Sequence, residues 1–170
     1  MIPRLSSFLV ILFVSTLLAD SAFARRLSNA DVRRFGFSGV YRGEAQGFIK
    51  TKDDDKFDTR LVTQGTREIL PVRNRSIVTG PSGRNGFFLT LGNISGNERR
   101  ITVRMYYSGR SYNPAYEEDM IGTGTKILTI QKFNGSRPQY EMSLIDRLQE
   151  RAVNGGSIFT TWDIQGRLFK

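Results

Sequence analysis

The 170-residue sequence contains neither cysteine nor histidine. The lack of cysteine excludes disulfides, a thiol nucleophile and thiolate metal sites. The lack of histidine removes the commonest general base and the usual zinc and haem ligand. No catalytic motif stands out either, so we expect no catalytic residue, metal or other cofactor, and a fold held together by its apolar core.

Long hydrophobic runs are also rare. The longest, Phe8–Leu18, is short for a membrane span. It follows Arg4 and precedes Ala22-Phe23-Ala24, which has the small-x-small form of a cleavage site. This pattern predicts a cleavable export signal over residues 1–24, a single soluble domain over residues 25–170, and a secreted or periplasmic location. An uncleaved N-terminal membrane anchor is the alternative, because it shares these features.

Acidic residues are fewer than basic ones, 16 against 25, which gives a net charge of +9. Such a chain is attracted to anionic surfaces such as lipid head groups, acidic polysaccharide or nucleic acid. Nucleic acid is disfavoured as a partner because the chain is expected to be exported and has no RNA- or DNA-binding motif. A solvated basic surface without any partner accounts equally well for the charge.

Strand patterns dominate the rest of the sequence. Gly39–Thr51 carries small residues with Tyr41 and Ile49 on one face and mostly polar or charged residues on the other, as expected for a strand in a curved sheet. Roughly eight to nine such segments follow one another through short turns, with no strand-helix-strand alternation. We therefore predict an all-β fold, an antiparallel up-and-down barrel with a short N-terminal helix. In this barrel the first long strand pairs with the last one, Ser157–Phe169.

Several connections can also be predicted. Ser28, with an acidic residue three positions later, predicts a capped helix start. Lys52–Lys56 predicts a hairpin tip, because its three adjacent aspartates lack the alternate spacing and turn glycine of a calcium loop. The dipeptide Asn134-Gly135 predicts a second hairpin. Gly109–Gly124 lacks periodicity and is predicted to be a loop, either for binding or simply flexible, while Ile145–Val153 is undecided between strand and helix.

The segment Phe37-Ser38-Gly39-Val40-Tyr41-Arg42-Gly43 follows a short helical lead-in and resembles the opening of lipocalin-like (calycin) barrels. In that family a Gly-x-Trp motif starts the first strand, and an arginine near the end of the last strand packs across the ring. Tyr41 stands at the position of that tryptophan, and Arg167 is the candidate arginine. The glycine-rich first strand also looks like that of related haem-binding barrels, whose ligating histidine is missing here. Two fragments, Ala45-Gln46-Gly47-Phe48 and Gly122-Thr123-Gly124, look like pieces of dirigent-type barrels without the residues expected before the first.

The first functional hypothesis is a barrel that holds a small, partly apolar molecule in its interior or open mouth. Eight-stranded barrels are just wide enough to hold one small ligand or to be filled by side chains. The candidate ligand-binding residues are those predicted to face inward: Tyr41, Ile49, Val103, Met105, Tyr107 and Trp162. The alternative is that these side chains simply fill the core.

The second hypothesis is a structural or interaction protein of the cell envelope that binds anionic polymer or lipid head groups, with a membrane surface as one partner. The candidate anion-binding residues are Arg100, Arg104, Arg110 and Tyr106, since the planar fork of arginine suits phosphate and carboxylate.

An enzyme is the third hypothesis. A carboxylate pair, as in glycoside hydrolysis, would come from Glu44, Asp58, Glu117, Glu118, Asp119, Glu141 and Asp163, but the sequence does not indicate which two face each other. Asn74, Asn93 and Asn134 start Asn-x-Ser/Thr motifs, for which coincidence is a better account than glycosylation because the motif is short.

Overall fold

A computed structural model of the chain describes residues 25–79, 85–113, 117–136, 138–153 and 158–170. The predicted export signal lies outside the described residues, and the prediction of export therefore stays a prediction. Within the described ranges, no helix is long and apolar enough to cross a membrane.

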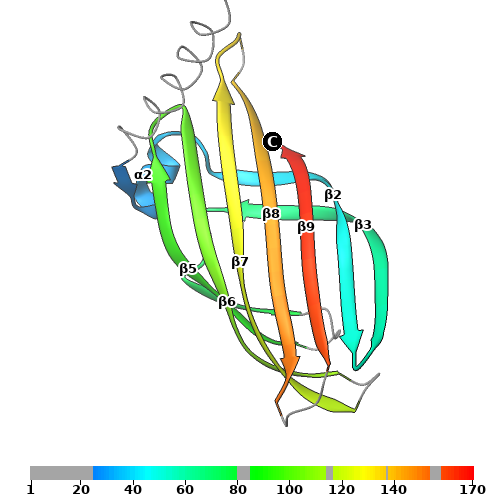
Figure 1. Cartoon of the computed structure of the whole chain (residues 1–170). Helices are drawn as coiled ribbons and strands as arrows, with labels where there is room; N and C mark the ends of the chain where they lie inside the picture. Colours follow the sequence, from blue (N-terminus) through cyan, green and yellow to red (C-terminus); the bar gives the residue numbers. More distant parts are fainter. Residues whose placement is uncertain (1–24, 80–84, 114–116, 137, 154–157) are drawn as a thin grey trace, which may run out of the picture.

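The described chain is all-β, with nine antiparallel strands in one sheet and a single short helix (Figure 1). The strand order is β1-β5-β6-β7-β8-β9-β2-β3, and β4 pairs with the other end of β5. The elements are β1 (Arg25–Leu27), α2 (Asn29–Arg34), β2 (Gly39–Asp53), β3 (Lys56–Leu70), β4 (Arg75–Thr79), β5 (Asn85–Gly96), β6 (Arg100–Asn113), β7 (Glu118–Phe133), β8 (Gln139–Ala152) and β9 (Phe159–Phe169).

The predicted pairing of the first long strand with the last strand is confirmed. β2 and β9 are antiparallel neighbours from Arg42 opposite Phe169 to Lys52 opposite Phe159. The sheet is nevertheless not shown closed into a barrel, because β3 and β4 are not paired with each other in the part of the chain that the structure describes. The prediction is therefore confirmed for the all-β class and the antiparallel sheet, but not for closure.

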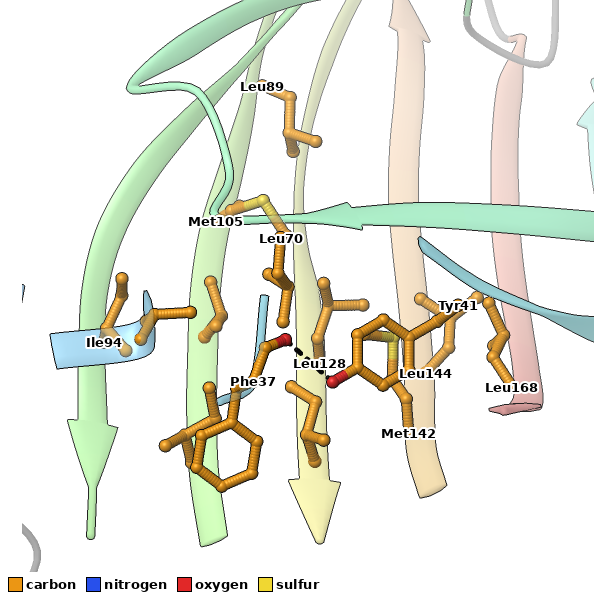
Figure 2. Packing of buried hydrophobic residues seen from close by; sticks show 14 of the residues in the cluster. Phe37, Tyr41, Leu70, Leu89, Ile94, Met105, Leu128, Met142, Leu144 and Leu168 are labelled. Carbon is orange, nitrogen blue, oxygen red and sulfur yellow. Dashed lines mark hydrogen bonds between the residues drawn. The ribbon is translucent and has the colours of Figure 1, made fainter. Parts of the chain in front are cut away.

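Along most strands one face is buried and the other is exposed, so the sheet must curl around its own core. We call the buried face the inner face. The hairpin of β2 and β3 contributes to the curl, because its upper half bends and runs across the other strands (Figure 1). This bend brings Tyr41 and Leu70 against Leu128, Met142 and other residues of the main core cluster (Figure 2).

Glycines on the inner face of β2 explain how closely its neighbour packs. A Cβ atom added to Gly47 would lie 2.0 Å from the carbonyl oxygen of Asp163 in β9, and one added to Gly43 would lie 2.0 Å from that of Arg167. Only residues without a side chain fit at such a distance from a neighbouring backbone. At these positions on the predicted small-residue face of β2, the backbone of β9 therefore leaves no room for a side chain.

The prediction of a loop at Gly109–Gly124 is wrong. β6 continues to Asn113 and β7 begins at Glu118, so most of this stretch is a paired hairpin, whose tip at residues 114–116 lies outside the described residues. Apolar alternation is weak because most inner positions here are glycine or polar, namely Gly109, Ser111, Gly122 and Gly124, with Met120 as the apolar exception. Gly122 leaves space for the ring of Phe87, whose nearest atom would lie 2.1 Å from an added Cβ.

The other local predictions can be compared with the same elements. Asp54 and Asp55 form the turn between β2 and β3, and Asn134 begins the connection between β7 and β8, so both hairpins are confirmed. The undecided stretch Ile145–Val153 is strand as far as Ala152. Ser28 caps α2 through a reciprocal capping box with Asp31, which confirms the predicted helix start.

Candidate functional site

The strand register arranges the inner-face residues in rows that cross the sheet. One row contains Tyr107 of β6, Gly124 of β7, Leu148 of β8, Trp162 of β9 and Ile49 of β2. Three of the predicted ligand-binding residues therefore lie in one row, because directly opposite residues of paired strands share a face. Trp162 is only partly buried, whereas the other side chains of the row are buried.

The adjacent row contains charged side chains. Met105 of β6 is opposite Lys126 of β7, and Lys126 is opposite Asp146 of β8. The hydroxyl of Tyr107 donates a hydrogen bond to Oδ2 of Asp146 at 3.0 Å. Gly124 of β7 lies directly opposite Tyr107 and has no side chain, so the tyrosine can reach across β7 to Asp146 of β8.

A fourth polar residue reaches this place from the distant end of the sheet. Glu68 lies in the half of β3 that runs across the other strands, directly opposite Tyr41 of β2. Its carboxylate forms a salt bridge with Nζ of Lys126 at 2.5 Å, and Lys126 lies 3.6 Å from Asp146 Oδ2. We call Glu68, Tyr107, Lys126 and Asp146 the inner cluster. Its three charged side chains are only 14–15% exposed.

Burial and charge determine the protonation of the inner cluster. Burial alone would lower the pKa of Lys126, but the carboxylates of Glu68 and Asp146 outweigh it and raise that pKa, so the lysine is held as an ammonium ion. Burial raises the pKa of Asp146, opposed by Lys126 and the Tyr107 hydrogen bond. Burial and the neighbouring Asp146 charge raise the pKa of Tyr107, which keeps its phenol neutral.

One acceptor in the inner cluster is left without a hydrogen bond. Oδ1 of Asp146 is buried and has no partner among the described residues. Buried polar atoms in folded proteins are rarely left in this state, because the lost hydrogen bond costs free energy. The position is suited to a hydrogen-bond donor that the described part of the chain does not supply.

The row on the other side of Trp162 is also polar. It contains Glu150 of β8 opposite Thr160 of β9, which is opposite Thr51 of β2. Glu150 is almost completely buried and accepts a hydrogen bond from Ser111 Oγ at 3.1 Å. Thr51 and Thr160 share a hydrogen bond of 3.3 Å. Beyond Trp162 the inner face therefore combines these polar groups with a second, small apolar cluster of Met120, Ala152 and Ile158.

The remaining predicted ligand-binding residues belong to the apolar part of the inner face. Tyr41 is fully buried and donates its hydroxyl to the carbonyl of Phe37 at 2.8 Å (Figure 2). Val103 and Met105 are buried in the same core cluster. All six predicted residues thus lie on one face, but Tyr41 and Val103 fill the core away from the partly open row of Trp162.

The predicted anion-binding residues lie on the opposite, outer face, along β6. Arg100, Arg104 and Arg110 are exposed and form no salt bridge within the described residues, and Tyr106 is 48% exposed. We call these four residues the basic stripe. The outer positions of β7 beside it are all uncharged, from Ile121 opposite Arg110 to Gln131 opposite Arg100. The stripe is long rather than compact. Arg110 lies six positions after Arg104 in the strand, which corresponds to a distance of roughly 20 Å along it.

A second outer feature is a hollow of about 860 Å³ across β3, β2, β9 and β8. Its lining includes the exposed ring of Phe48, the directly opposed Gln46 and Gln165, and both acidic and basic side chains. It contains none of the residues predicted to bind a ligand or an anion.

Among the carboxylates considered for a catalytic pair, Glu44 and Asp163 both line the outer hollow. Asp163 binds Arg147 at 3.3 Å and Glu141 lies 3.7 Å from Arg167, both on the outer face. The buried carboxylates are instead Glu68, Asp146 and Glu150. The sequence analysis missed them because an isolated polar residue in a strand pattern indicates the exposed face. The one available signal was that Asp146 and Glu150 share the strand phase of Leu144 and Leu148.

Comparisons of the chain with protein-family models, with curated proteins and with solved structures returned no match. The resemblance to lipocalin-like barrels therefore stays a prediction.

Proposed function

We propose that this chain is an exported, barrel-type protein that binds a small, partly apolar molecule against the inner face of its curled sheet. The unpaired side between β3 and β4 would be the entrance. Trp162, Ile49 and Leu148 would contact the apolar part of the molecule, since such sites combine apolar walls with a few polar groups.

The inner cluster is the observation that supports this proposal. Burying three charged groups costs desolvation free energy, and apolar side chains of similar size would often be as stable or more stable. Perturbed titratable groups in a partly enclosed site are typical of functional sites. A ligand hydroxyl would donate a hydrogen bond to Asp146 Oδ1 and thereby satisfy an acceptor that has no partner among the described residues.

Matched probes test this chemistry. 2-Naphthol carries a hydroxyl donor on an apolar ring, and 2-methoxynaphthalene has the same ring without the donor. Both would be titrated against the protein with displacement of the neutral dye Nile red as the readout. We expect 2-naphthol to bind roughly 10- to 100-fold more tightly, the value of one hydrogen bond to a charged group.

Substitutions at two aspartates then locate the site. Asp146→Asn should abolish most of the preference for 2-naphthol. Asp163→Asn, the same change on the outer face of the neighbouring strand, should leave the preference intact. Unfolding in urea checks that both variants are folded. If Nile red does not bind, or if Asp163→Asn has the same effect as Asp146→Asn, the proposed site is wrong.

The basic stripe supports a second candidate function, the binding of anionic lipid or polymer at the envelope. Arg104 and Arg110 are free of salt bridges in the described chain, and arginine binds phosphate and carboxylate in a bidentate manner. The double variant Arg104→Gln/Arg110→Gln should bind anionic phospholipid vesicles several-fold more weakly than wild type in a sedimentation assay. The double variant Arg33→Gln/Arg67→Gln removes the same charge elsewhere and should bind nearly as well as wild type. Vesicle binding that persists unchanged in high salt would contradict an electrostatic origin.

A further inference from the structure

β3 ends the sheet and has one unpaired edge. It runs for 15 residues and pairs only with β2, along its whole length, in the part of the chain that the structure describes. An unpaired edge of this length presents a row of free backbone donors and acceptors to any other strand. Proline, bulges and inward-pointing charges commonly protect such edges; β3 has no proline or bulge, and its inward-pointing charges, Asp58 and Arg60, are opposite in sign.

The first half of β3 is exposed on both faces. On the outer face, Phe57 is 76% and Leu61 is 62% exposed. Between them, Asp58 and Arg60 point to the inner face and are exposed too. This half lies at the margin of the sheet, beside β2 (Figure 1).

We propose that the edge of β3 pairs antiparallel with β3 of a second copy of this chain, in a register centred on Thr59. A two-fold axis at Thr59 places Phe57 opposite Leu61 and Asp58 opposite Arg60 of the partner. Each pair then occurs twice, because the interface is related by symmetry. Apolar pairs meet on one face and opposite charges meet on the other, and both kinds of cross-strand pair are stabilising.

The second half of β3 is not available for such pairing. It runs across the other strands, with Leu70 in the core and Glu68 bound to Lys126. A register centred further along, at Thr63, would also place Asp58 opposite Glu68, a like-charge pair that is destabilising. The register at Thr59 uses only the exposed half and pairs opposite charges.

This pairing would extend the sheet across two molecules. The outer hollow is lined on one side by Leu61 and Thr63 of β3, so two hollows would lie on either side of the interface. The inference is independent of the proposed ligand, because neither Asp58 nor Arg60 belongs to the inner cluster.

Charge exchange tests the register directly. The full chain, expressed with its N-terminal segment so that any processing takes place, is expected to sediment as a dimer at high concentration in analytical ultracentrifugation. Asp58→Lys would place two basic residues opposite each other, and Arg60→Glu would place two acidic ones. Each single variant should therefore weaken the dimer at least tenfold.

Mixing the two single variants restores the complementarity. In a mixed dimer the introduced lysine faces the introduced glutamate, and the native Arg60 faces the native Asp58, so the mixture should dimerise as wild type does. Arg67→Glu changes an exposed charge in the second half of β3 and should leave the dimer unchanged, and circular dichroism checks the fold of every variant. A wild-type chain that remains monomeric, or single variants that dimerise like wild type or fail to associate when mixed, would overturn the proposal.

Discussion

Lys126 is the residue on which the inner cluster depends. It is the only cation of the four, and it lies between the carboxylates of Glu68 and Asp146. Without it, two buried carboxylates would face each other with no opposite charge, a situation that is strongly destabilising. The lysine also connects β7 to the distant strand β3, so it fixes the fold of the sheet as well as the chemistry of the site.

Tyr107 gives the inner cluster a measurable pH dependence. Its pKa is raised above the ordinary value of 10.0, as is that of Tyr41, because both phenols are buried. A raised pKa means that the fold favours the neutral phenol. This contribution to stability is therefore present below about pH 10 and lost as the pH rises further, when the unfolded chain ionises its tyrosines.

Urea unfolding at about pH 8, pH 10 and pH 11 would measure this loss. We expect the free energy of unfolding to fall above about pH 10, with each buried tyrosine contributing roughly 1.4 kcal/mol per pH unit. Tyr107→Phe should make the decline shallower by about one such contribution. Tyr106→Phe, on the outer face of the same strand, provides the matched comparison. An identical decline in wild type and Tyr107→Phe would show that Tyr107 is not buried as a neutral phenol.

At the scale of the elements, the pairing of β2 with β9 depends on glycine. Gly47→Ala places a methyl group where the backbone of Asp163 already lies, so the two strands must separate. We expect this substitution to lower the free energy of unfolding by about 1–3 kcal/mol, as overpacking does.

Gly65→Ala is the control for this prediction. No atom lies within 4 Å of the Cβ position at Gly65. The substitution should be neutral or stabilising by up to about 1 kcal/mol, because alanine restricts the unfolded chain. Equal effects of the two substitutions in urea unfolding would contradict the close approach of β2 and β9.

Individual strands were predictable from the sequence where apolar and polar residues alternate. Val103, Met105 and Tyr107 were predicted to face inward, and all three lie on the buried face of β6. The alternation fails where the inner face needs a glycine, as at Gly122, or a charged group, as at Asp146. The inner cluster itself was not predictable, because it depends on the register of three adjacent strands and on the bend that brings Glu68 to Lys126.

At the scale of the whole molecule, the two faces of the sheet differ in charge. The inner cluster contains two carboxylates and one ammonium group, whereas the outer face carries the basic stripe in a chain of net charge +9. An apolar molecule with a hydrogen-bond donor suits the inner face, and an anionic surface suits the outer one. In the two proposals, ligand binding and surface attachment therefore take place on opposite sides of one sheet.

The proposed ligand enters the curled sheet beside Trp162, the only tryptophan in the chain. Replacing it with 5-fluorotryptophan gives a single fluorine resonance that reports on the inner face. During titration with 2-naphthol this resonance should shift and saturate, and the shift should be much weaker in Asp146→Asn. A resonance that does not move up to the solubility limit of 2-naphthol would contradict binding at the inner face.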